Sequence, residues 1–252
     1  IDAFILDGTP GPYNFDIRES YAIQSGVAIV GKDTWSTFKA RETLKVDWDL
    51  STASRDDSDA IEAEALTALA AGKVETEIER AGDVDAAFAN AAMTADATYS
   101  TDFVSHAQLE PQGVVISAAT SAVEVWTSSQ TPVFVTSNLV KLLDVTPGNI
   151  TVHQLRGGGG FGRRLSNEYI YEAALISRRV GAPVKLQWKR EDDMAFDYFR
   201  APTYYRLQGA ISSDGQLTGW KNLVASASAD GKTANYGAGY RPYDFPGKVI
   251  AN

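Results

Sequence analysis

Apolar residues recur along the chain with two spacings, one typical of helices and one typical of strands. Spacings of three and four residues predict helices, which begin near Asp33, Ser58, Val84, Thr131 and Ser166. Alternating or short unbroken apolar runs predict strands, at residues 26–30, 44–48, 97–104, 114–116, 123–126, 150–155, 184–188, 204–211 and 217–225. Because the last two strands flank a Ser-Ser-Asp-Gly turn and follow the final helix, the order of elements predicts an α+β fold.

The helix after residue 166 has clear boundary signals. Ser166 is a suitable N-cap, the apolar face runs through Tyr169 and Ala173, and Gly181 with a following proline ends the helix. A glutamate in the first turn and two arginines in the last turn suit the helix dipole. The sequence therefore places a helix N-terminus directly after its most unusual stretch.

That stretch is residues 156–164, Arg-Gly-Gly-Gly-Gly-Phe-Gly-Arg-Arg. Glycine in such a run gives up backbone entropy, so it indicates positive φ angles or a close approach of the backbone to another group. A strand precedes the run and a helix follows it, and this arrangement presents several backbone N–H groups to an anion. We therefore favour a cofactor cradle over a tight structural turn.

Two nucleotide-binding patterns fit the same loop incompletely. Gly157, Gly159 and Gly162 have the dinucleotide spacing, but the next strand runs into two basic residues and not into the carboxylate expected for a ribose. Gly157 and Gly162 also have the outer spacing of a phosphate-binding loop. Arg163 and Arg164, however, stand where its lysine and magnesium-binding hydroxyl belong. A phosphate- or nucleotide-binding module stays open as an alternative, as does a structural interaction domain.

Composition narrows the classes of function. With 44% hydrophobic and 22% charged residues, the 252-residue chain has the make-up of a globular protein of one or two domains. A net charge of −9 argues against nucleic-acid binding. The absence of cysteine excludes disulfides and cysteine-ligated iron–sulfur clusters within these residues, and two histidines cannot form a histidine-rich metal site. We expect no metal ligand and no membrane-spanning segment here. Because the first residue is isoleucine, we expect a processed chain or a piece of a longer one.

The glycine-rich segment resembles that of the molybdenum hydroxylases, the xanthine oxidase and aldehyde oxidoreductase family. It is most similar to the large subunits of the isoquinoline 1-oxidoreductase branch. Residues 105–112, Ser-His-Ala-Gln-Leu-Glu-Pro-Gln, resemble the family's His-Ala-x-x-Glu-Pro segment. Residues 125–132, Val-Trp-Thr-Ser-Ser-Gln-Thr-Pro, resemble its Trp-x-x-x-Gln-x-Pro segment. The three matches occur in the family's order, and residues 27–49 add a weaker likeness to the small domain that precedes the molybdenum domains.

The resemblance implies a domain organisation. Residues 1–50 would form part of a small hammerhead-like α/β domain, and residues 51–75 a linker and helix. Residues 76–252 would form the first part of a molybdopterin-binding domain with a mixed sheet and packed helices.

The resemblance also implies a cofactor, molybdopterin with molybdenum, in the cytosine dinucleotide form that bacterial relatives use. Six residues would bind it, namely Gly158, Gly159, Gly160, Phe161, Gly162 and Arg163. The glycines would let the backbone approach the pterin, and Phe161 would lie beside the metal. Two interpretations of Arg163 and Arg164 stay open, a contact to cofactor phosphate or substrate and a salt bridge at the helix entry. His106 and Glu110 are expected near the cofactor without touching it.

Members of this family hydroxylate an aldehyde or an N-heteroaromatic carbon with water as the oxygen source. Three partners are implied, an iron–sulfur subunit or domain, the remaining part of the same large subunit, and a small-molecule substrate. The family's catalytic glutamate lies near the C-terminus of the full subunit, so we expect no catalytic residue here and no activity of the chain alone. Val104 and Leu165 stand where purine-type members carry glutamine and glutamate, which points away from purines. A periplasmic location is implied by exported relatives, with a cytoplasmic one as the alternative.

Overall fold

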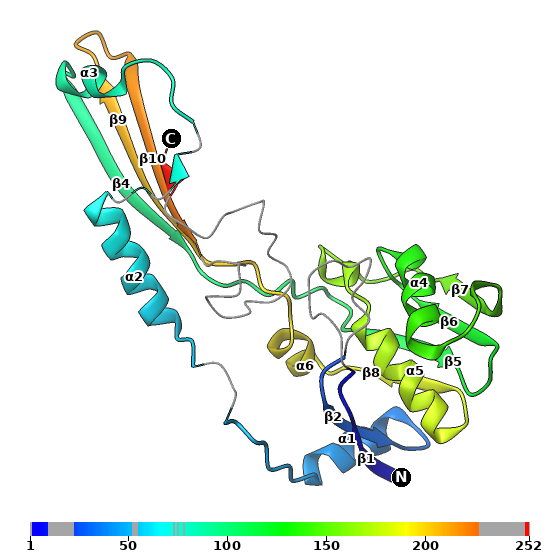
Figure 1. Cartoon of the computed structure of the whole chain (residues 1–252). Coiled ribbons are helices and arrows are strands. Elements are labelled where there is room, and N and C mark those ends of the chain that lie inside the picture. Colours follow the sequence, from blue (N-terminus) through cyan, green and yellow to red (C-terminus); the bar gives the residue numbers. More distant parts are fainter. Residues whose placement is uncertain are drawn as a thin grey trace. The chain divides into compact units, whose positions relative to one another are not determined.

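The computed structural model describes residues 2–9, 23–51, 55–72, 74, 76–77, 79–226 and 250–251. The chain forms two compact units, and each unit combines two separate stretches of sequence. The first unit comprises Ile1–Ser51 and Ser105–Tyr198, and the second comprises Thr52–Val104 and Phe199–Asn252 (Figure 1). The domain boundaries expected near residues 50 and 75 stay a prediction, and residues 227–249 of the expected cofactor domain lie outside the described ranges.

A four-stranded mixed sheet forms the centre of the first unit, in the order β7-β6-β5-β8. Its strands are β5 (Gly113–Ser117), β6 (Val123–Thr127), β7 (Ile150–Gln154) and β8 (Val184–Gln187). β5 pairs antiparallel with β6 and β8, whereas β6 and β7 are parallel. A parallel pair needs a crossover connection, and the helix α4 (Pro132–Leu143) supplies it. The mixed sheet and the packed helices agree with the expected α+β fold.

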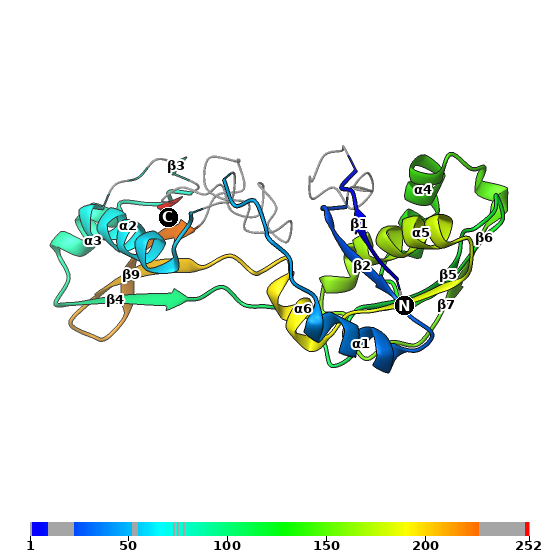
Figure 2. The ribbon, with the colours of Figure 1, turned by 90° about the horizontal axis from the view of Figure 1, so that it is seen from below.

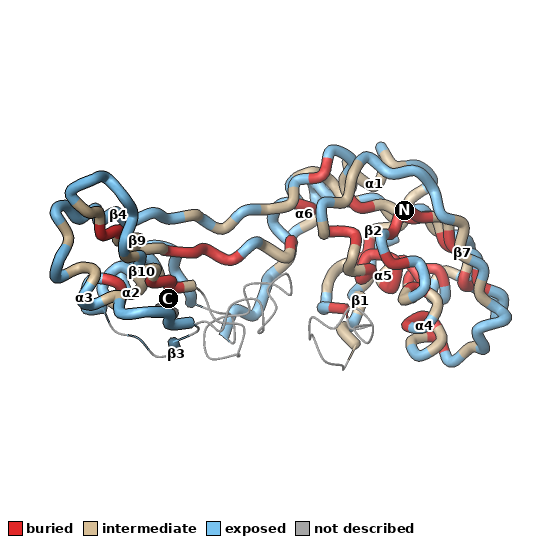
Figure 3. Tube along the Cα trace, turned by 90° about the horizontal axis from the view of Figure 1, so that it is seen from above, coloured by how far each residue is buried: buried red, intermediate tan, exposed pale blue. Residues whose placement is uncertain are grey.

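The helices α4 and α5 (Glu168–Val180) lie on the same face of this sheet (Figure 2). Their apolar faces form the core together with the sheet, as shown by the full burial of Val125, Leu139 and Ile170 (Figure 3). Gly181 ends α5 in the left-handed conformation, as predicted. The predicted N-cap was one residue early, because Asn167 and not Ser166 occupies that position.

Residues near the N-terminus add a two-stranded sheet and a helix to the first unit. β1 (Asp2–Leu6) and β2 (Gly26–Val30) pair antiparallel, and α1 (Thr34–Thr43) begins after the predicted cap Asp33. Ile23 is 1% exposed and belongs to the core cluster of the central sheet. The strand predicted at residues 44–48 does not form, and these residues are irregular. Alternation alone does not make a strand that lacks a partner.

A second sheet dominates the other unit, in the order β3-β11-β10-β9-β4. Its strands are β3 (Thr76–Glu77), β4 (Met93–Thr101), β9 (Thr203–Ile211), β10 (Leu217–Ser226) and β11 (Ile250–Ala251). The predicted hairpin between β9 and β10 is confirmed. α2 (Ser58–Ala71) packs Leu69 against Tyr204 and Leu223. The second unit also contains the short helix α3 (Val84–Ala89). No helix within the described ranges is long and apolar enough to cross a membrane.

Candidate functional site

The fold brings the three recognised segments together in the first unit. The glycine-rich loop connects β7 to a short 3-10 turn, η2 (Arg163–Leu165), and then to α5. Glu110 accepts a hydrogen bond from the Gly158 N–H at 2.6 Å, and the side chain of Gln130 accepts one from the Gly162 N–H at 3.0 Å. Segments that are far apart in sequence therefore hold the two ends of one loop.

Three residues of the loop have positive φ angles, in the left-handed region of backbone conformation. Gly159 has a φ of 92° and Gly162 one of 104°, both of which favour glycine. Phe161 between them has a φ of 52°, which is uncommon for a residue with a side chain. The residue as a whole is 74% exposed. The loop thus holds an aromatic ring outward at some conformational cost, which is a frequent property of ligand-binding sites.

Three other glycines are required by the protein's own packing. A Cβ added at Gly157 would lie 2.7 Å from the Ser128 side chain, and one at Gly158 would lie 2.6 Å from Cβ of Glu110. A Cβ at Gly160 would collide with the Gln130 amide. The close approach that the sequence indicated is therefore, at these positions, an approach to other segments of the same unit.

A run of unpaired donors lies between these anchored points. The backbone N–H groups of Gly159, Gly160 and Phe161 donate no hydrogen bond to any described residue, whereas those of Gly158 and Gly162 do. Three successive N–H groups without a partner among the described residues are available to an anionic or electron-rich ligand. The loop thus has the donors that a phosphate- or oxygen-bearing cofactor needs.

Arg163 points into the protein and not toward this row of donors. Its side chain is fully buried, where it pairs with Glu168 and lies 3.3 Å from Asp197. Its guanidinium also stacks near the rings of Trp188 and Tyr198. Desolvation opposes the charge, but the adjacent carboxylates raise the pKa of Arg163 above its usual value. The side chain therefore has the geometry of the salt bridge at the helix entry, and the predicted cofactor contact stays untested.

Arg164 joins the loop to the Glu110 segment. Its Nε donates to the Gly159 carbonyl at 2.9 Å and its Nη2 donates to the Glu110 carbonyl at 2.8 Å. The guanidinium also lies 3.6 Å from the Glu110 carboxylate. The side chain is only 2% exposed, so its charged hydrogen bonds to the loop and to the Glu110 segment are shielded from water and hold the two together.

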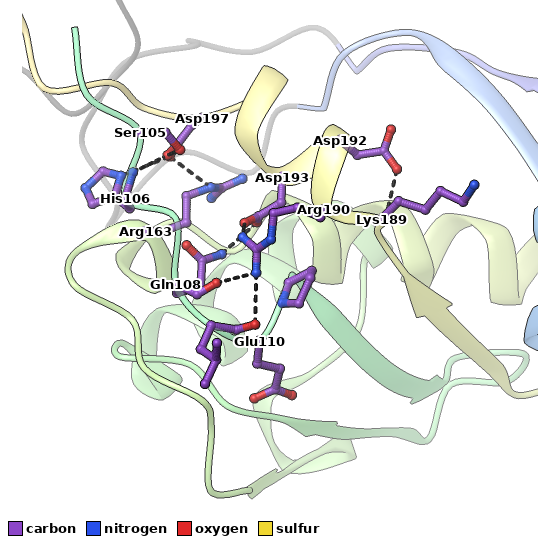
Figure 4. A network of polar contacts seen from close by, with 12 residues as sticks. Ser105, His106, Gln108, Glu110, Arg163, Lys189, Arg190, Asp192, Asp193 and Asp197 are labelled. Atoms are coloured by element: carbon purple, nitrogen blue, oxygen red, sulfur yellow. Dashed lines mark hydrogen bonds and ion pairs between the residues drawn. The ribbon is translucent and has the colours of Figure 1, made fainter. Parts of the chain in front are cut away.

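Asp197 is a central member of the site that the sequence did not single out. It accepts hydrogen bonds from the Ser105 hydroxyl at 2.6 Å, from the His106 backbone N–H at 2.6 Å and from His106 Nδ1 at 2.9 Å (Figure 4). Burial alone would raise the pKa of Asp197, but these donors outweigh it and lower the pKa to about 2. Since Arg163 contacts the same carboxylate, Asp197 links the residue 105–106 segment to the end of the loop.

A second acidic residue holds the middle of the same segment. Asp193, in α6 (Arg190–Ala195), accepts from the Gln108 amide at 2.6 Å and pairs with Arg190 at 2.9 Å. Arg190 in turn donates to the carbonyls of Gln108 and Leu109 at 2.5 and 2.9 Å (Figure 4). The four-residue spacing of Asp193 and Asp197 after a basic pair was the available sequence signal. α6 thus positions the segment that positions the loop.

Comparison with known families assigns this arrangement. Residues 67–239 match the model of the molybdopterin cofactor-binding domain, and the chain belongs to that family. The match includes the three converging segments and parts of both units. Molybdopterin with molybdenum is therefore the cofactor class of this fold, in agreement with the cofactor expected from the glycine-rich loop.

Individual relatives agree with this assignment. The chain is 31% identical over 234 residues to the membrane-bound aldehyde dehydrogenase [pyrroloquinoline-quinone] of Gluconacetobacter polyoxogenes, covering 89% of the chain and 30% of the relative. It is 29% identical over 221 residues to the isoquinoline 1-oxidoreductase subunit beta of Brevundimonas diminuta, covering 84% of the chain and 28% of the relative. The chain thus spans less than a third of the length of these proteins.

A solved structure supports the fold. Reconstituted CO dehydrogenase from Oligotropha carboxidovorans superposes with a TM-score of 0.55 and 20% sequence identity, over 80% of this chain and 28% of that chain. At this identity the likeness concerns the fold alone. It shows that the mixed sheet and packed helices described above share their arrangement with that protein.

Proposed function

We propose that the chain is part of the molybdenum-cofactor-binding subunit of an oxidoreductase that hydroxylates an aldehyde or an N-heteroaromatic carbon with water as the oxygen source. The family supports the cofactor class. The names of an aldehyde dehydrogenase and an isoquinoline oxidoreductase among the relatives support the two substrate classes. Val104 and Leu165 lack the amide and carboxylate that purine-type members carry, which is consistent with these substrates.

One observation carries the proposal: within the part of the chain that the structure describes, the N–H groups of Gly159, Gly160 and Phe161 donate no hydrogen bond. These donors would hold an oxygen-bearing part of the cofactor, while Glu110 and Gln130 fix the loop on either side. When bound, the cofactor supplies a two-electron redox centre. The exposed ring of Phe161 would cover one side of that centre and exclude water from it.

The described carboxylates next to the loop are engaged in holding it. The Glu110 carboxylate binds the Gly158 N–H and lies beside Arg164, and Glu168 pairs with Arg163. We infer that neither acts as the base, which fits a catalytic glutamate in a part of the subunit outside this chain. An iron–sulfur subunit or domain would accept the electrons, because the chain has no cysteine to bind a cluster. The cytosine dinucleotide form of the cofactor and a periplasmic location are further parts of the proposal.

The direct test is the cofactor content of the complete subunit, purified together with its neighbours. We expect stoichiometric molybdenum by elemental analysis, and a fluorescent pterin with a cytosine nucleotide after acid release. A bound quinone in place of the pterin would overturn the molybdenum proposal in favour of the cofactor in the Gluconacetobacter relative's name. If a subunit purified from a host that makes both cofactors contains neither a metal nor an organic cofactor, the result would favour the alternative of a structural interaction domain.

A double variant separates ligand space from internal packing at Gly160. Gly160→Ala alone is ambiguous, because the new Cβ would collide with Gln130. In Gly160→Ala/Gln130→Ala the collision with Gln130 is removed, and we expect that cofactor loss persists, because the proposed ligand would lie against the backbone of residues 159–161 and the added methyl group would narrow that space. Gln130→Ala is the matched control, and it should retain more cofactor than the double variant. Full cofactor content in the double variant would show that Gly160 serves packing only.

A further inference from the structure

His106 joins the buried network to the loop surface. Its ring is held at Nδ1 by Asp197, and its side chain is 19% exposed. The other ring nitrogen, Nε2, makes no hydrogen bond with any residue that the structure describes. Figure 4 shows the ring beside Asp197 at the edge of the polar network. One nitrogen is therefore committed to the protein and the other is available.

The Asp197 contact fixes which nitrogen is available. The low pKa of Asp197 keeps it a carboxylate, which can only accept, so Nδ1 carries the hydrogen of this bond. In the neutral ring Nε2 then has a free lone pair, and in the charged ring it has a free N–H. The backbone N–H of His106 donates to the same carboxylate, so two hydrogen bonds join this residue to Asp197.

Because Gly162 has no side chain, His106 Nε2 can lie close to the loop backbone. A Cβ at Gly162 would lie 3.1 Å from His106 Nε2, closer than a side chain tolerates without a shift. Gly162 directly follows Phe161, whose N–H is the last of the three free donors. The unused nitrogen of His106 thus lies beside Gly162, the residue that follows the three donors in sequence.

We propose that His106 Nε2 is a hydrogen-bonding contact to the oxygen-bearing ligand on the free N–H groups, with Asp197 as the residue that positions the ring. This inference rests on the proposed function and changes the expectation that His106 stays out of contact with the cofactor. Asp197 acts through His106 and Arg163, and does not itself reach the ligand.

Chemical modification of histidine tests the contact without a substitution. The chain has two histidines, and His153 is an internal control because it stacks on Trp126, at 4.9 Å between ring centroids. The complete subunit is treated with diethyl pyrocarbonate, with its cofactor and after cofactor removal, and both sites are quantified by mass spectrometry of peptides. We expect cofactor to slow modification of His106 at least about tenfold and that of His153 less than about twofold.

Cofactor release from variants gives a second measurement. His106→Gln should release pterin about tenfold faster than the unaltered subunit, the effect of one lost hydrogen bond. His153→Gln should release it at the unaltered rate. If the unaltered subunit carries pterin but His106 is modified equally fast with and without it, this inference is wrong and the proposed function stands. If the subunit carries no pterin at all, the proposed function fails first.

Discussion

Two carboxylates of the first unit, the buried Asp197 and the half-buried Glu172, differ in the charge state that the fold favours. Asp197 is 1% exposed at its side chain, yet its donors lower its pKa to about 2. Glu172 lies on α5, where desolvation and the negative charge of Glu168 raise its pKa to about 8, despite a hydrogen bond from Trp188. The number of donors, and not burial itself, decides which of the two is ionised near neutral pH.

This difference in pKa identifies the part of the unit that stabilises a buried negative charge. Around Asp197 several donors converge from different segments, so the ionised form is preorganised there. Around Glu172 burial is not matched by donors, and the protonated form is the favoured one. The site network is therefore the place where the fold holds charge next to the loop.

The largest effect on stability is expected from removing the carboxylate of Asp197, which contacts Ser105, His106 and Arg163. Asp197→Ala leaves the Arg163 guanidinium buried with one carboxylate fewer and should lower the free energy of unfolding by about 3–5 kcal/mol near pH 7. Because the pKa of Asp197 is lowered on folding, its contribution is present above the ordinary value of 3.8 and is lost as the pH falls toward 2. Urea denaturation at several pH values measures this. A difference that does not shrink below pH 4 would contradict the assignment.

A smaller effect of opposite pH dependence is expected at Glu172. Its pKa is raised from 4.5 to about 8 on folding, so the folded state is progressively destabilised as the pH rises between these values. Glu172→Gln removes the titration and should stabilise the chain near pH 8 while leaving it unchanged near pH 4. Thermal denaturation at both pH values measures the difference, and the low-pH pair is the control. Equal shifts at both pH values would mean that the charge of Glu172 is not the cause.

The smallest effect is expected at an ion pair of the second unit. Asp96 accepts from Arg206 at 2.7 Å, but the two side chains are 43% and 28% exposed. Asp96→Asn should therefore cost less than about 1 kcal/mol, and less still at high salt. It is the matched comparison for the Asp197 variant, because both remove a carboxylate from an arginine. A loss as large as that of Asp197 would show that exposure does not separate the two pairs.

Much of the fold could be predicted because local signals and tertiary packing agree. The helices after Asp33 and Thr131 and the hairpin of β9 and β10 form where the apolar spacing and turn residues place them. The strand at residues 44–48 failed because its alternation finds no partner strand among the residues that the structure describes. The pairing of the first 51 residues with Ser105–Tyr198 was not predictable either, because it depends on contacts between segments distant in sequence.

The glycine-rich loop of the site was predicted from sequence, but the buried carboxylates that hold the neighbouring segment were not. A glycine run reports a special conformation directly, so the loop itself could be found from sequence. The residue types of Asp193 and Asp197 do not by themselves indicate burial, since acidic residues in a polar stretch are usually solvated. Their burial follows only from the packing of α6 and the residues directly after it against the Ser105–Glu110 segment and Arg163. Arg163 illustrates the same limit, because its residue type suits a ligand contact and a buried ion pair equally well.

The division of the first unit into two sequence stretches has a consequence for synthesis of the chain. Ile23 packs in the same core as residues of α5, and Asp197, at the end of the second stretch, completes the network around Arg163. On the ribosome the first 51 residues must therefore wait until the whole intervening stretch, Thr52–Val104, has emerged. At about 5–20 residues per second this delay lasts many seconds, during which the early apolar segments have no native partner.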